Sequence, residues 1–107
     1  MKNESLVITK TVEDGICRLV AKGRIDTGSS DILLFHLEEA LRDNQKAILL
    51  NMTQIEYLSS IGIRVILKIY KQAAEAGGKF NIERPSEIVK NILGMAALRE
   101  LLVQENS

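Results

Sequence analysis

The residues with the clearest chemical potential are two adjacent serines, Ser59 and Ser60, between an apolar segment and a long helical pattern. We place them in the first turn of the helix, where backbone N–H groups lack intrahelical partners and the helix dipole is positive. A phosphate on a serine hydroxyl is stabilised in such a position. Gly62 keeps the same turn slim, so that another backbone can come close. The position of the two serines at the start of the helix therefore predicts a site that could hold a phosphate.

The same residues have a simpler explanation. Serines at the start of a helix are most often caps that accept a hydrogen bond from the first turn. Gly62 alone indicates tight helix packing. The residues by themselves therefore leave a capped helix and a phosphate-bearing helix both open.

The sequence has few residues that could form a catalytic relay, a metal site or a cofactor site. His36 is the only histidine and Cys17 the only cysteine, so a Ser-His-Asp relay would depend on His36 and a structural zinc site would lack ligands. Cys17 lies in an apolar run and is predicted to be a buried, inert thiol. The sequence has no phosphate-binding loop, dinucleotide fingerprint, HExxH or GxSxG motif. We expect no catalysis, no cofactor and no metal.

Composition narrows the function classes further. The 107 residues predict one domain spanning 1–107, and the 14 basic and 14 acidic side chains cancel. Without a concentrated basic face we expect neither nucleic-acid binding nor docking to acidic membranes. No apolar stretch reaches the roughly 20 residues that span a bilayer, and residues 1–5 have no signal core. We expect a cytoplasmic protein that does not insert into a membrane.

The first half of the chain predicts a hairpin followed by a helix. Two strands, 6–12 and 16–22, flank an Asp-Gly turn, and residues 23–28 form a loop. Ser29 or Ser30 is expected to cap the following helix. Ile32 and Phe35 fall off its apolar face, which hints at a contact surface.

The second half predicts alternating strands and helices. A buried strand at 46–52 is followed by a connection over 53–58, a helix ending at Gly77–Gly78, and a strand at 79–83. A third helix is expected to start near Pro85, to bury Ile88, Ile92 and Leu93, and to stop at Gly94; residues 98–102 suggest a closing helix. This alternation indicates an α/β fold with a mixed sheet.

Residues 50–63, LNMTQIEYLSSIGI, resemble the signature of STAS domains. In that family a strand ending in Leu-Asp-Leu-Ser leads through a hydrophobic and an aromatic residue to Asp-Ser-Ser-Gly-Leu. Residues 23–26 resemble the family's Gly-x-Leu-Asp turn, and residues 70–80, 84–86 and 98–102 match its later elements in order. The resemblance implies a STAS fold with a four- to five-stranded mixed sheet and about four helices packed on it.

Three positions depart from the family pattern. Ser59 stands at the signature Asp, Ile61 at the second Ser, and Asn51 at the strand-end Asp. Losing the acid at position 59 eases the entry of a phosphate electrostatically. It equally removes a group that a kinase could read.

The resemblance is to anti-sigma-factor antagonists in particular, bacterial regulators of transcription. It implies that Ser60 is the regulatory phosphorylation site, that the partners are an anti-sigma factor with serine-kinase activity and a cognate phosphatase, and that the chain is not an enzyme. Asp26 is expected near Ser60, where its charge would repel a phosphate at a packed interface. The implied partner-binding residues are Asp26, Thr27, Ser59, Ser60, Ile61, Gly62, Ile63 and Arg64, with part of the first helix.

Simpler roles exist for these residues. Asp26 and Thr27 could be turn formers, Ile61 and Ile63 partial core, and Arg64 a solvated residue of the first turn. Two alternative functions also stay open. One is a constitutive STAS scaffold subunit of a signalling or lipid-transport complex, and the other is a module that binds a small ligand or nucleotide.

Overall fold

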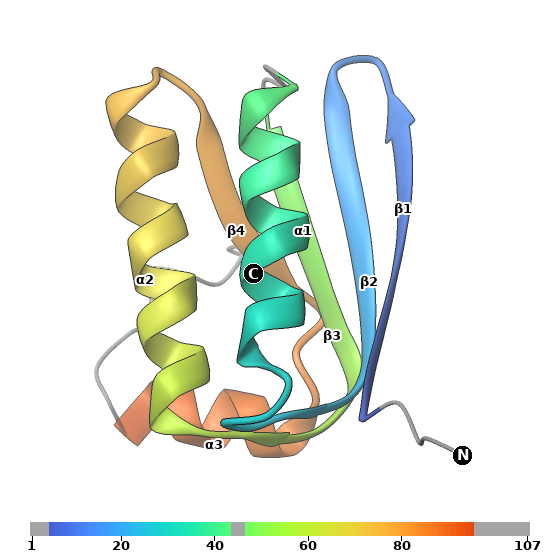
Figure 1. Cartoon of the computed structure of the whole chain (residues 1–107), viewed down its shortest axis with the longest axis vertical. Helices are drawn as coiled ribbons and strands as arrows, with labels where there is room; N and C mark the ends of the chain where they lie inside the picture. Colours follow the sequence, from blue (N-terminus) through green and yellow to red (C-terminus); the bar gives the residue numbers. More distant parts are fainter. Residues whose placement is uncertain (1–4, 44–46, 96–107) are drawn as a thin grey trace, which may run out of the picture.

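A computed structural model describes residues 5–43 and 47–95 of the chain. Within them a four-stranded mixed sheet has the order β1-β2-β3-β4, and α1 and α2 lie side by side across one face of it (Figure 1). α3 lies at the end of the sheet where α1 and α2 begin. The elements are β1 (Leu6–Glu13), β2 (Ile16–Ile25), α1 (Ser30–Arg42), β3 (Ala47–Leu58), α2 (Ser60–Glu75), β4 (Lys79–Glu83) and α3 (Glu87–Met95).

The opening hairpin is confirmed. β1 pairs antiparallel with β2, and the turn between them places Asp14 and Gly15 at φ 54° and 79°, as an Asp-Gly hairpin turn requires. β3 pairs parallel with both β2 and β4. The α/β mixed sheet that the sequence predicted is therefore present, with four strands and, in the described part of the chain, three helices.

The core lies between the sheet and the two long helices. Alternate residues of the strands point to this side, and the helices meet them with residues at helical spacing. Cys17 is among the buried residues, and burial raises the pKa of its thiol, as an inert core cysteine requires. The buried set includes Leu19, Ala21, Ile48, Leu50, Met52, Phe80 and Ile82 from the strands and Leu33, Leu37, Ala40, Ile66, Ile69 and Ala73 from the helices.

The predicted connection over 53–58 was wrong. β3 continues to Leu58, and β2 runs on to Ile25 through residues that the sequence assigned to a loop. The pairing of β2 with β3 contains register shifts between Val20 and Lys22 and between Gly23 and Arg24. Because of these irregularities, the buried residues of β3 recur at every third position after Met52. The sequence of this part therefore lacks the alternation of apolar and polar residues that is typical of a strand.

The third helix begins and packs differently from the prediction. Pro85 lies before α3, and the Ser86 hydroxyl accepts the Val89 N–H at 3.3 Å, so Ser86 is the cap. Val89 and Leu93 are buried, whereas Ile88, which we expected inside, is 39% exposed. The helix continues past Gly94 to Met95. The closing helix predicted over 98–102 lies outside the described residues.

Gly23 marks the closest approach between the first two strands. Its φ is +122°, and a Cβ there would lie 2.1 Å from the backbone oxygen of Ser5. Gly77, which ends α2 as predicted, also has a positive φ, +84°, but a Cβ there would meet nothing within 4 Å. A side chain at Gly77 would therefore meet only the penalty of a left-handed backbone, whereas one at Gly23 would also collide with the Ser5 backbone.

We expect Gly77→Ala to lower the free energy of unfolding by about 1 kcal/mol, since only the left-handed conformation is penalised. Gly23→Ala should cost at least roughly twice as much, because backbone atoms must also move. Urea unfolding of the two variants measures the difference. Equal losses would show that the contact at Ser5 does not constrain the sheet.

Candidate functional site

The carboxyl ends of β2 and β3 meet at one edge of the sheet, and α1 and α2 begin there, at the bottom of Figure 1. The last pair of the two strands is Ile25 with Leu58. One residue further on, the Ser59 N–H donates to the Ile25 carbonyl at 2.9 Å. This hydrogen bond joins the start of α2 to the turn that begins α1.

The two serines divide the roles that the sequence left open. Ser59 is the N-cap of α2, with extended backbone (φ −85°, ψ 170°), and its Oγ accepts the Gly62 N–H at 3.2 Å. Ser60 is the first helical residue and is exposed, and within the described part of the chain its hydroxyl has no hydrogen-bond partner. Capping is done by Ser59, so the Ser60 hydroxyl is available for another use.

Gly62 holds the first turn of α2 against the sheet. A Cβ at this position would lie 2.5 Å from Ile25 Cγ2 and 2.8 Å from Leu58 Cδ1. The close approach is thus to two side chains, and not to another backbone as the sequence suggested. Gly62 is buried, so it supports the predicted partner surface from below and is not exposed on it.

The turn after β2 is held by Asp26. Its Oδ1 accepts the N–H groups of Gly28 and Ser29 at 3.0 and 3.1 Å. Ser29 is fully buried, its hydroxyl donates to the Arg24 carbonyl at 2.6 Å, and it makes no side-chain cap bond to α1. Ser29 therefore stands at the N-cap of α1 as predicted, but its hydroxyl is bonded to the strand end and does not cap the helix. The carbonyl of Asp26 accepts the first helical N–H, that of Ser30, at 2.9 Å.

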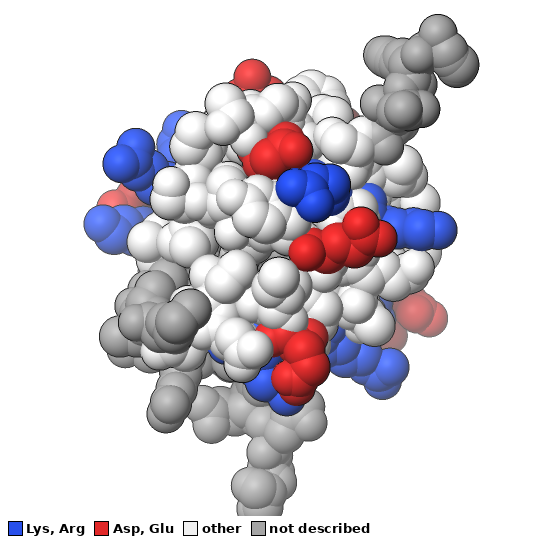
Figure 2. Space-filling view, turned by 90° about the horizontal axis from the view of Figure 1, so that it is seen from below, with Lys and Arg blue, Asp and Glu red and all other residues white. Residues whose placement is uncertain are grey.

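The charges around this end are mixed. The Arg24 guanidinium lies 4.7 Å from the centre of the Tyr57 ring, and its Nε lies 3.9 Å from Asp26 Oδ2. The first turn of α2 carries no acidic residue. Figure 2 looks onto this end and shows a largely uncharged face with acidic and basic side chains scattered over it.

The predicted partner residues gather around this edge of the sheet. Thr27, Ser60 and Arg64 are exposed, and Ile61 is 36% exposed. Asp26, Ser59 and Ile63 are half-buried. The eight residues come from two segments, 26–27 and 59–64, which the hydrogen bond between Ser59 and Ile25 joins.

Arg24 and Tyr57 lie at the same edge and are not among the residues that the sequence predicted there. They are partners in the parallel pairing of β2 and β3, and Tyr57 is 37% exposed. Only the knowledge that β3 continues to Leu58 would have placed the two side chains together. Ile32 and Phe35 of α1, 38% and 57% exposed, confirm the apolar exposure that the helix pattern indicated.

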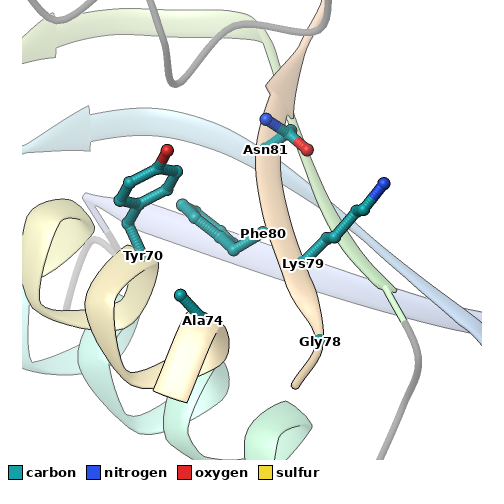
Figure 3. A pocket seen from close by; sticks show the side chains of 6 residues that line it. All are labelled: Tyr70, Ala74, Gly78, Lys79, Phe80 and Asn81. Atoms are coloured by element: carbon teal, nitrogen blue, oxygen red, sulfur yellow. The ribbon is translucent and has the colours of Figure 1, made fainter. Parts of the chain in front are cut away.

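Two hollows lie near the C-terminal ends of α1 and α2, away from the serine pair. One, of about 360 Å³, lies between the second half of α2 and β4, where the rings of Tyr70 and Phe80 lie side by side and Lys79 and Asn81 point away from the helix (Figure 3). The other, of about 390 Å³, lies between α1 and α2 beside Leu41 and Ala76. Neither includes a residue of the predicted partner surface. None of the described helices has the length and apolar character needed to cross a bilayer.

Comparison with known proteins identifies the family. The profile of the STAS domain matches residues 7–106. This chain belongs to the STAS domain family. A relative of this STAS domain, the anti-sigma F factor antagonist of Paenibacillus polymyxa, is 26% identical over 89 residues, which cover 82% of this chain and 76% of the relative.

Solved structures confirm the STAS fold. An anti-sigma factor antagonist from Mycobacterium paratuberculosis superposes with a TM-score of 0.82 at 17% identity, covering 92% of this chain and 83% of the other. The Bacillus cell fate determinant SpoIIAA in its phosphorylated form has a TM-score of 0.72 at 13% identity, covering 91% and 89%. The unphosphorylated SpoIIAA has a TM-score of 0.77 at 14% identity, covering 91% and 86%. At these identities the likeness is one of fold.

Alanine substitutions can test the division of roles between the serines. We expect Ser59→Ala to lower the free energy of unfolding by about 1 kcal/mol, because the Gly62 N–H loses its acceptor. Ser60→Ala should change it by less than about 0.5 kcal/mol, since the hydroxyl is exposed and unbonded. Urea unfolding measures both, and a larger loss from Ser60→Ala would mean that Ser60 is the structural serine.

Proposed function

We propose that this STAS domain is an anti-sigma-factor antagonist, a non-enzymatic binding protein that captures an anti-sigma factor and is switched off by phosphorylation of Ser60. One observation carries the proposal above all. The hydroxyl that aligns with the family's regulatory serine is exposed at the first residue of α2, and the capping bond is made by its neighbour Ser59. Modification of Ser60 therefore leaves the helix cap intact.

The reaction would belong to the partner kinase. The Ser60 hydroxyl gives its proton to a base of the kinase, its oxygen forms a bond to the γ-phosphorus of ATP, and the bond from that phosphorus to the β–γ bridging oxygen breaks to release ADP. A separate phosphatase would hydrolyse the ester and restore the hydroxyl. ATP is bound by the kinase, so the STAS domain itself needs no cofactor.

A local charge is sufficient for the switch. Phosphorylation adds about −1.5 to −2 charges. In the free protein, water and the helix start accommodate this charge, but at a packed interface it must be desolvated. Asp26, in the turn joined to Ser59 through Ile25, adds a second negative charge that the partner would have to cover. A penalty of about 3–4 kcal/mol would weaken the complex several-hundred-fold.

The proposed partner surface is the edge formed by residues 26–27 and 59–64. Exposed apolar area comes from Ile61, and charge from Arg64 and Asp26, with Gly62 beneath. Arg24 and Tyr57 border it. Its scattered charges, visible in Figure 2, suit a protein partner better than a polyanion, which would need a continuous basic face.

Small-ligand binding remains the second candidate because of the hollow in Figure 3. The half-buried Tyr70 ring is the one aromatic group of its lining that a flat ligand could contact, since Phe80 is buried, and the Lys79 side chain comes from the same strand. A nucleotide titration followed by NMR tests this directly. Shifts confined to residues 70–81 at micromolar nucleotide would favour the ligand-binding function over the switch.

Acidic and neutral substitutions at Ser60 test the switch. We expect Ser60→Asp to abolish capture of the anti-sigma kinase from lysates of the source cell, because the carboxylate adds charge at the interface. Ser60→Ala should bind as the native protein does and should accept no phosphate from the captured kinase and ATP. Affinity capture, phosphosite mapping and in vitro phosphorylation measure these effects.

The alternatives give different outcomes. A constitutive scaffold subunit would bind its partner equally well with alanine or aspartate at position 60, and Ser60 would carry no phosphate in growing or stressed cells. Either result would overturn the proposed switch. Thr11→Asp serves as a matched control, since it adds the same charge at an exposed residue of β1 near the opposite end of the sheet and should leave binding unchanged.

A further inference from the structure

We infer that Arg64 is the intramolecular partner of a phosphate on Ser60. The inference rests on the proposed function, since it concerns the modified state of the same serine. Arg64 would hold the phosphate in the free protein, and phosphorylation would thereby lower the cationic character of the partner surface.

Helix geometry places the two side chains together. Ser60 and Arg64 are four residues apart in α2, so their Cβ atoms lie about 5–6 Å from each other. Side chains of a helix lean toward its N-terminus, and a long side chain covers the turn before its own Cα. The Arg64 side chain is therefore long enough to bring its guanidinium over the first turn, where a phosphate on the Ser60 oxygen would lie.

Arg64 is available for this pairing, whereas the neighbouring cations are engaged. Arg64 is exposed, and none of the ion pairs among residues 5–43 and 47–95 includes it. Lys68, one turn further along α2, pairs with Glu38 of α1 at 3.7 Å. Arg24 is stacked on Tyr57 beside Asp26. No acid in the first turn of α2 competes with the phosphate for Arg64.

The pairing gives phosphorylation two effects at one surface. It adds negative charge at position 60, and it engages a cation that the unphosphorylated protein presents to the partner. The guanidinium is planar and donates two parallel hydrogen bonds to phosphate oxygens, which a lysine cannot match. The pair also places opposite charges one turn apart at the start of α2, where negative charge favours the helix.

The pairing can be measured on protein that carries phosphoserine at position 60, installed genetically or by ligation so that no kinase is needed. Titration of the phosphate by ³¹P NMR reports its second pKa, which is about 6 without a partner. We expect a lower value in the otherwise native protein, because a nearby cation favours the dianion. Arg64→Gln should raise this pKa by about 0.2–0.4 unit, as expected for an exposed pair on a helix, and 1 M salt should shrink the difference.

Two variants serve as controls. Lys71→Gln removes the same charge from the same face of α2 two turns further along and should leave the pKa nearly unchanged. Arg24→Gln tests the other nearby cation and should have the smaller effect. The inference is overturned if Arg64→Gln has no effect, if Lys71→Gln matches it, or if Arg24→Gln exceeds it. Because phosphoserine is installed directly, this result is independent of whether a kinase modifies Ser60, which the capture experiment decides.

Discussion

The site depends on how the first turn of α2 is attached to the end of the sheet. The Ser59 N–H donates to the Ile25 carbonyl, and Gly62 lies so close to Ile25 and Leu58 that a methyl group would not fit. This contact sets where the helix starts, which serine caps it and which serine faces solvent.

Ile25 also connects the site to α1. The residue ends β2, pairs with Leu58, and is followed at once by the turn that Asp26 and Ser29 hold. Ser29 is buried with its hydroxyl bonded to the Arg24 carbonyl, so this turn has little freedom. The two helix starts are thus fixed relative to each other, and a phosphate added at Ser60 would act as a charge on a rigid surface.

A rigid surface suits a charge-based switch. The native and phosphorylated forms need not differ in backbone, provided that the partner must desolvate the phosphate. Arg64 would offset part of the added charge within the free domain, which favours the isolated phosphorylated state over the complex.

The sequence by itself determined the α/β class, the Asp14–Gly15 hairpin, the start of α2 at the serine pair and its end at Gly77, because each rests on local backbone chemistry or on simple periodicity. Tertiary structure decided what non-local contacts control. β3 extends to Leu58 because β2 pairs with it through register shifts, which no alternation reveals. Ser29 is a buried hydroxyl and not a cap because the Arg24 carbonyl competes for it, and Ile88 is exposed because packing selects Val89. The choice between Ser59 and Ser60 as cap was likewise invisible in sequence, since both are serines and only the contact with Ile25 distinguishes them.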